Sequence, residues 1–184
     1  MKNNPVLETI HSRRSIRKYK DTPLTDEQIQ ALVEAALISP SSRNMQPWHI
    51  TVLTNRSIIL DWEKEIVQYF IDANVEWAIE HNKSRNNKIF YDAPAVFVIS
   101  MEKDKGMDVG IVAQSIALAA KGMGLDSVIL GFPRVTFESK FQGKWEENLK
   151  FPADYVYGVS VAVGYGDEAG REREPDMSKV TYLS

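Results

Sequence analysis

The chain is organised around a short basic stretch near its start, which reads Ser12-Arg13-Arg14-Ser15-Ile16-Arg17-Lys18-Tyr19. Four of its eight side chains are cationic, and a hydroxyl group lies among them at Ser15. The planar guanidinium group of arginine donates pairs of hydrogen bonds that match the oxygen atoms of a phosphate. The stretch therefore predicts an anion clamp, whereas a solvated basic face beside a helix end is the ordinary alternative for a lone basic run.

A second polar stretch favours the ligand-binding interpretation, and it reads Ser39-Pro40-Ser41-Ser42-Arg43-Asn44-Met45-Gln46-Pro47-Trp48-His49. It is dense in small hydroxyl and amide side chains and contains two prolines. An anion clamp together with a loop of neutral hydrogen-bonding groups indicates one ligand that has a charged end and a polar, uncharged body.

The composition sets limits on the class of protein. A length of 184 residues favours a single domain, 1–184. The net charge of −3 argues against a general nucleic-acid or membrane-surface binder, and no apolar run is long enough to span a bilayer. The chain has no cysteine, which removes disulfides, thiol nucleophiles and thiolate metal sites. With no signal-peptide core near the start, we expect a cytoplasmic protein.

Apolar periodicity and turn residues predict helices over 5–11, 25–37, 61–82 and 108–121, a short helix near 141–149, and strands over 48–54, 95–99, 126–130 and 155–163. The continuous apolar run over 95–99 is typical of a central strand that is buried on both faces. The helix over 109–120 is apolar nearly all round and needs cover on all sides, so we infer a homodimer. The β-branched end, 180–183, could add a strand to a sheet edge of this chain or of a partner.

Two further patterns argue against a bound metal ion and against a permanently bound dinucleotide. The three histidines, His11, His49 and His81, are too scattered for a metal motif, so we expect no metal. The run from Gly164 to Ala169 matches a loose dinucleotide fingerprint, but no apolar-periodic helix follows it. A nicotinamide cofactor would therefore visit as a substrate.

The charged tail offers a second set of cations. Arg171 and Arg173 lie on one side of the chain if this segment is extended. A solvated charge run is the ordinary reading. Combined with the arginines near the start, the pair could close the same phosphate site from the far end of the chain.

Taken in order, four features resemble the FMN-dependent nitroreductase family: the basic stretch, the polar loop, Ala93-Pro94 before an apolar strand, and Gly164-Tyr165 before a basic tail. The resemblance covers most of the chain, although 58–91 matches no motif. It implies an α+β sandwich, with a central, mostly antiparallel sheet flanked by helices. It also implies an intertwined homodimer with one FMN per subunit at the interface.

The resemblance implies a set of cofactor contacts, which follow the parts of FMN. The phosphate, ribityl chain and pyrimidine edge would be held by Arg13, Arg14, Ser15 and Arg17, and the phosphate would also be contacted by Arg171 and Arg173. The ring near its reactive nitrogen N5 would be bordered by Ile129, Leu130 and Gly131. The flavin of the other subunit would be reached by Pro40, Ser41, Ser42, Asn44 and Gln46. Arg17 is the residue expected to stabilise negative charge on the reduced ring.

The resemblance also implies an activity. Electrons would pass from NADH or NADPH through FMN to an electron-poor small molecule, such as a nitroaromatic or a quinone, in a ping-pong sequence. The alternatives are a specialised reduction such as dehalogenation, flavin breakdown, a non-catalytic flavin-binding or storage protein, and an anion- or nucleic-acid-binding module. The aromatic residues of the unmatched region are candidates for an acceptor wall or for ordinary core: Tyr69, Phe70, Trp77, Phe90 and Tyr91.

Overall fold

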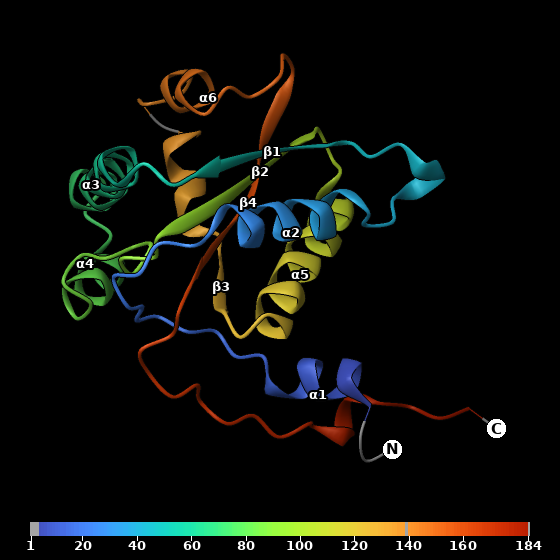
Figure 1. Ribbon diagram of the computed structural model, residues 1–184. Helices are drawn as coiled ribbons and strands as arrows, with labels where there is room; N and C mark the ends of the chain where they lie inside the picture. Colours follow the sequence, from blue (N-terminus) through green and yellow to red (C-terminus); the bar gives the residue numbers. More distant parts are fainter. Residues whose placement is uncertain (1–3, 139, 184) are drawn as a thin grey trace.

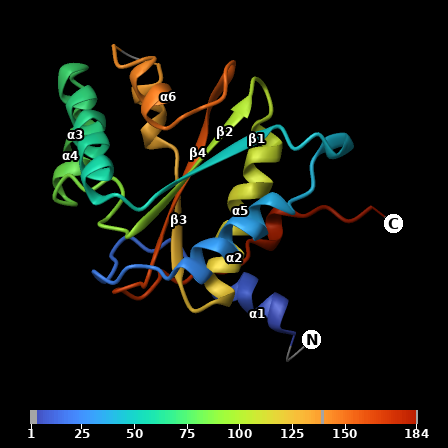
Figure 2. The same cartoon turned by 45° about the horizontal axis from the view of Figure 1, so that its top comes forward.

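A four-stranded antiparallel sheet forms the centre of the molecule, with the strand order β1-β2-β4-β3 (Figure 1). The structure is a computed structural model and describes residues 4–138 and 140–183. The strands are β1 (Trp48–Leu53), β2 (Ala95–Glu102), β3 (Asp126–Leu130) and β4 (Tyr155–Gly164). Helices cover the sheet, so the expected α+β sandwich with an antiparallel sheet is confirmed (Figure 2).

The predicted central strand is the interior strand β2. Ile99 pairs with Ile50 of β1, and Phe97 pairs with Val161 of β4. Because side chains alternate along a strand, Phe97 and Ile99 point into one apolar core while Val98 points into the other. A strand that serves two cores must be apolar on both faces, which explains the unbroken apolar run.

One face of the sheet is covered by α2 (Asp26–Leu37) and α5 (Gly106–Gly122). A capping box begins α2: Gln28 N donates to Thr25 Oγ1 at 3.2 Å, and Thr25 N donates to Gln28 Oε1 at 3.0 Å. These two bonds satisfy backbone donors that the first turn of a helix leaves unpaired.

The structure corrects the reason given for a dimer at α5. The inward apolar residues of this helix, such as Val112 and Ile116, are buried by the sheet and by α2 of the same chain. Gly110 and Gln114 occupy its solvent side. No second copy is needed to cover the helix, and the homodimer stays a prediction on other grounds. In the described part of the chain, no helix is long and apolar enough to cross a membrane.

The other face is covered by α3 (Arg56–Asp72), α4 (Glu76–Lys83), the short 3-10 helix η2 (Phe132–Thr136) and α6 (Lys144–Asn148). Trp62 of α3 is fully buried and stacks on Trp145 with ring centroids 5.3 Å apart. Its indole N–H donates to Thr136 Oγ1 at 2.9 Å, so the polar end of the ring is satisfied inside the core.

The expectation of one long helix over 61–82 is wrong. The structure has two helices, and α3 begins earlier, at Arg56, after an N-cap by Asn55. Asn74 adopts a left-handed backbone with φ 50°, and Val75 N donates to Phe70 O at 3.0 Å. Asparagine tolerates this conformation at a helix end, but it is a weaker stop signal in a sequence than glycine or proline.

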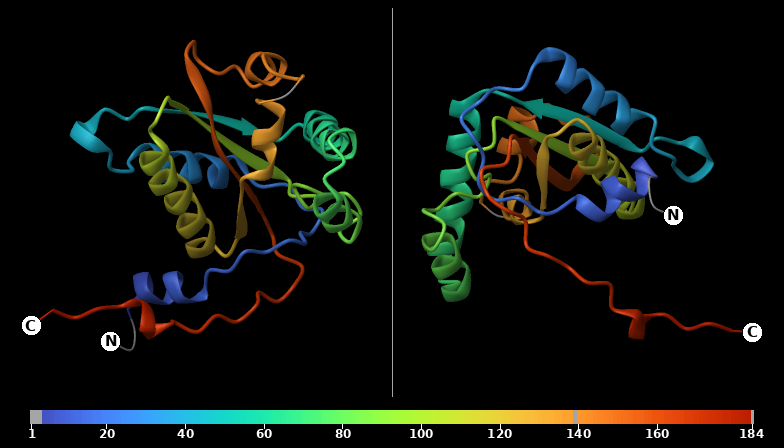
Figure 3. Two further views of the ribbon diagram at one scale, coloured as in Figure 1. Left: turned by 180° about the vertical axis from the view of Figure 1, so that it is seen from behind. Right: turned by 60° about the horizontal axis from the view of Figure 1, so that its bottom comes forward.

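The two ends of the chain meet below the sheet (Figures 1 and 3). α1 (Pro5–Ser12) precedes the basic stretch, and the tail after β4 runs beside α1 through the short 3-10 helix η3 (Met177–Lys179). Residues 180–183 form no strand with this chain. Tyr182 and Leu183 are almost fully exposed, which leaves their apolar surface uncovered.

Candidate functional site

Backbone hydrogen bonds tie the basic stretch to β3 on one side and to the segment that follows β4 on the other. Ile16 N donates to Ser127 O at 3.1 Å, at the edge of β3. Asp167 N donates to Lys18 O at 2.9 Å, and Lys20 N donates to Tyr165 O at 2.8 Å. Residues from the start and the end of the chain are therefore tied together at one corner of the sheet.

Two buried side chains set which residues of the stretch face solvent. Ile16 and Tyr19 point into the core, and the Tyr19 hydroxyl donates to Ile16 O at 2.8 Å. Burial raises the pKa of the Tyr19 phenol, so this hydroxyl stays protonated. With these two side chains turned inward, Arg17 and Lys18 are left on the surface.

A cavity of about 680 Å³ lies where the stretch meets the tail. Five arginines and two glutamates are among its lining residues, which gives it a positive excess in an acidic chain: Arg13, Arg14, Arg17, Arg171, Arg173, Glu172 and Glu174. Ser15 also lines it. The predicted meeting of the arginines from both ends of the chain is therefore seen in the structure.

Gly170 allows this meeting. A Cβ atom at this position would lie 2.4 Å from Cβ and 2.5 Å from Cγ of Arg14. Contacts this short do not occur, so any side chain at Gly170 would push the tail away from the basic stretch. The tail arginines depend on this close passage for their place beside the cavity.

Backbone carbonyls and one carboxylate hold the clamp residues in place. Arg14 Nη1 donates to His11 O at 2.5 Å and to Arg13 O at 2.7 Å. Arg17 Nη1 donates to Ser15 O at 3.2 Å, and its backbone N–H donates to Glu168 Oε1 at 2.5 Å. Each guanidinium carries five N–H donors, so donors remain for an anion.

The polar loop does not reach this cavity. None of Pro40, Ser41, Ser42, Asn44 and Gln46 lines it. The loop, with the 3-10 turn η1 (Ser42–Asn44), projects on the side of the molecule opposite α3 and α4 (Figure 1). One bond ties the loop to α5, where Ser42 N donates to Asp108 Oδ1 at 3.3 Å, and one bond lies within the loop, where Gln46 N donates to Ser41 Oγ at 2.9 Å.

The stretch from Ile129 to Gly131 divides into inward and outward positions. Leu130 is buried, and its carbonyl accepts a hydrogen bond from the Tyr157 hydroxyl at 3.0 Å. Ser127 O points away from β4 because it accepts from Ile16, and backbone direction alternates along an antiparallel strand. The backbone of Ile129 therefore lies on the same open edge of β3, and its side chain is 39% exposed.

The aromatic residues of the unmatched region, for which an acceptor wall and ordinary core were both expected, divide between the core and the surface. Phe70 and Phe90 are core residues, 5% and 0% exposed, while Trp77 is 62% exposed. Two further rings lie beside Trp77, those of His81 and Phe132, which are 5.7 Å apart and were not among the residues predicted for this surface. The spacing of Trp77, His81 and Arg85 at i, i+4 and i+8 was the available signal.

Comparisons with known proteins agree with this architecture. The model of the nitroreductase family matches residues 10–165. A Vibrio harveyi NADPH-flavin oxidoreductase is 35% identical over 171 residues, which are 90% of this chain and 67% of that protein. A Methanothermobacter thermautotrophicus protein, provisionally named an NADH dehydrogenase/NAD(P)H nitroreductase, is 34% identical over 68% of this chain, which spans only 60% of that protein. The crystal structure of a Desulfitobacterium hafniense nitroreductase with bound FMN superposes with a TM-score of 0.93 at 30% identity, covering 98% of this chain and 99% of that one. The chain belongs to the nitroreductase family.

Proposed function

We propose that this chain is an FMN-dependent oxidoreductase that passes electrons from NADH or NADPH to an electron-poor acceptor such as a nitroaromatic or a quinone. The observation that carries the proposal is the cavity in which arginines from both ends of the chain meet beside the open edge of β3. The names of the relatives, a flavin oxidoreductase and an FMN-bound nitroreductase, support it.

The residues present fit FMN. Its phosphate is an anion, and five arginines line the cavity. The volume of about 680 Å³ lies within the usual range for small-molecule sites. Beyond the arginines, the open edge of β3 offers the backbone of Ile129 to a polar ring system. Arg13, Arg14, Arg171 and Arg173 would hold the phosphate, and Ser15 would bind the neighbouring polar groups.

Bound FMN would supply the redox chemistry, because its ring accepts a hydride from a nicotinamide and gives up the electrons to an acceptor. Arg17 would hold a fixed positive charge beside the pyrimidine part of the ring, where reduction places negative charge. The backbone of Ile129 would orient the ring along the sheet edge, with Leu130 and Gly131 continuing that border. The chain need not supply an acid–base side chain, since its residues bind, orient and stabilise.

The loop of Pro40, Ser41, Ser42, Asn44 and Gln46 would serve a second copy of the chain. It is exposed and carries three left-handed non-glycine residues, Arg43, Asn44 and Gln46, with φ between 49° and 54°. Strained backbone of this kind is typical of ligand-contacting loops. Because the loop lies far from the cavity of its own chain, we propose a homodimer in which it completes the partner's flavin site (Figure 1).

The visible spectrum of the purified protein tests the proposal. We expect a yellow protein that releases FMN on heating, bleaches with NADH or NADPH and recovers its colour with a nitroaromatic or quinone. Parallel double-reciprocal plots would indicate the ping-pong sequence. Size-exclusion chromatography should show a dimer that weakens when FMN is removed, because a ligand that binds only the dimer stabilises it. Release of FAD, or a well-folded colourless protein that takes up no FMN, would refute the proposal.

A further inference from the structure

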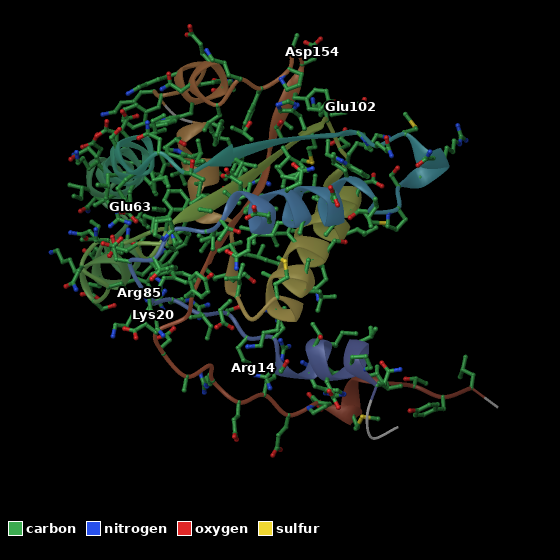
Figure 4. All side chains as sticks on the ribbon, viewed as in Figure 1. Arg14, Lys20, Glu63, Arg85, Glu102 and Asp154 are labelled. Carbon is green, nitrogen blue, oxygen red and sulfur yellow. The ribbon has the colours of Figure 1, made fainter. Side chains whose placement is uncertain are left out.

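Three side chains at helical spacing line one side of α4 and the turn after it: Trp77, His81 and Arg85. His81 and Arg85 are half-buried, whereas Trp77 is largely exposed. Figure 4 shows Arg85 beside α4, close to Lys20 of the segment after the clamp. Figures 1 and 3 agree that this segment of the chain passes α4.

An aromatic surface connects α4 to the open edge of β3. Phe132 follows directly after the exposed Gly131, at the end of β3. Its ring lies 5.8 Å from Trp77 and 5.7 Å from His81, measured between centroids. We call Trp77, His81 and Phe132 the acceptor platform. Planar rings stack on such surfaces in offset or edge-on arrangements.

The field at the acceptor platform is positive. The pKa of His81 is lowered by burial and by the charges of Arg85 and Arg17, and both charged groups that act on it are cations. Arg85 comes from the turn after α4, and Arg17 comes from the basic stretch. Two cations from separate segments of the chain therefore act on the imidazole of His81.

Arg85 is held in a fixed position with donors to spare. Its Nη1 donates to the Tyr91 hydroxyl at 2.7 Å, and the guanidinium carbon lies 5.6 Å from the centre of the Tyr91 ring. It makes no ion pair with any residue that the structure describes. An oriented guanidinium without a carboxylate partner matches the two oxygen atoms of a carboxylate.

We infer that the acceptor platform binds a planar aromatic acceptor and that Arg85 selects acceptors that carry an anionic group such as a carboxylate. The inference rests on the proposed function, because it assigns a substrate class to the same flavin site. Trp77 and Phe132 would stack on the acceptor, and Arg85 would pair with its anionic end. Arg85 is thus a specificity residue and takes no part in electron transfer.

The test compares two probes that differ by one charge, 4-nitrobenzoate and 4-nitrobenzamide. Their dissociation constants are measured by calorimetry on the oxidised FMN-loaded dimer without reductant, so that no turnover occurs. We expect the carboxylate to bind roughly tenfold more tightly than the amide, as one charge-assisted contact allows. Arg85→Gln should reduce this ratio to about one, and the ratio of kcat/KM for the two acceptors should fall in parallel.

Lys83→Gln is the matched control, because Lys83 is an exposed cation at the end of α4, two residues before Arg85. It should keep the tenfold ratio. Either probe should quench the fluorescence of the exposed Trp77, and Trp77→Phe should remove most of this quenching. The other three tryptophans are buried: Trp48, Trp62 and Trp145.

Three outcomes would overturn the inference. The first is a wild-type protein that binds 4-nitrobenzoate and 4-nitrobenzamide equally well. The second is a Lys83→Gln protein that loses the preference for the carboxylate as fully as Arg85→Gln. The third is an Arg85→Gln protein that is reduced more slowly by NADH or NADPH but keeps the wild-type preference. Each of these can occur in FMN-loaded protein that turns over acceptors, so each leaves the proposed function intact. A protein that takes up no FMN would overturn both.

Discussion

Replacing Glu63 by alanine should destabilise the fold strongly, although this residue lies outside the proposed flavin site. Glu63 belongs to α3 and is 5% exposed. Its Oε1 atom accepts hydrogen bonds from Ile89 N at 2.5 Å and from Phe90 N at 2.8 Å. These two bonds fix the segment that leads from α4 into β2, and this segment places Tyr91, the partner of Arg85.

The size of the effect follows from the burial of the two donors. Ile89 and Phe90 are both buried, so water cannot replace the carboxylate. A buried donor that loses its partner costs about 1–3 kcal/mol, which gives roughly 2–6 kcal/mol for the pair. Glu63→Gln should cost much less, because an amide oxygen can accept both hydrogen bonds.

The glutamine variant also gives a pH test with a defined sign. Burial raises the pKa of Glu63 above its ordinary value of 4.5. Between that value and the raised pKa, the folded state holds more protons than the unfolded state, so stability falls as the pH rises. The Lys88 ammonium, 4.0 Å from Oε2, offsets only part of the effect. Glutamine does not titrate, so wild type should lose stability relative to Glu63→Gln as the pH rises above about 4.5.

Urea unfolding of wild type, Glu63→Gln and Glu63→Ala at pH 4 to 8 measures these differences. Contributions from all other titrating groups cancel between wild type and the glutamine variant. If wild type instead gains stability over the glutamine variant with rising pH, the two N–H groups and Lys88 outweigh desolvation, and the reasoning from burial is wrong. An alanine variant that loses less than about 1 kcal/mol would refute the claim that the two donors depend on Glu63.

Three further predictions concern the proposed flavin site. Arg17→Gln should still bind FMN, but the reduction potential of the flavin should fall by some tens of millivolts, where about 30 mV corresponds to about 1.4 kcal/mol, and reduction by nicotinamide should slow. An unchanged potential in a redox titration would show that Arg17 is a phosphate anchor only. Arg173→Gln should weaken FMN binding in a salt-dependent way with little change in potential, and a salt-independent dissociation constant would contradict its phosphate role. Gly170→Ala should weaken FMN binding by displacing the tail from Arg14, whereas Gly122→Ala, which meets no atom within 4 Å, should leave the dissociation constant unchanged; equal affinities in the two variants would show that the close passage is unimportant.

Much of the architecture could be read from local patterns, because each pattern reflects a local physical constraint. The helix that begins after Thr25, the buried strand after Pro94 and the strand over 155–163 all appear where the sequence patterns placed them. Prediction failed at Asn74, where a single left-handed residue divides the expected long helix. It also failed at α5, because apolar composition does not reveal that α2 of the same chain covers the helix.

The sequence by itself determined the chemistry of the proposed site, since the guanidinium groups of the basic stretch and of the tail match the oxygen atoms of a phosphate. Only the tertiary structure decided that these two groups meet, because they lie more than 150 residues apart and are joined through hydrogen bonds at the edge of the sheet and a passage that Gly170 leaves open. The same holds for Phe132, His81 and Arg17, which come from three separate segments. Contacts between distant segments depend on how the layers pack, and no local period in a sequence records that packing.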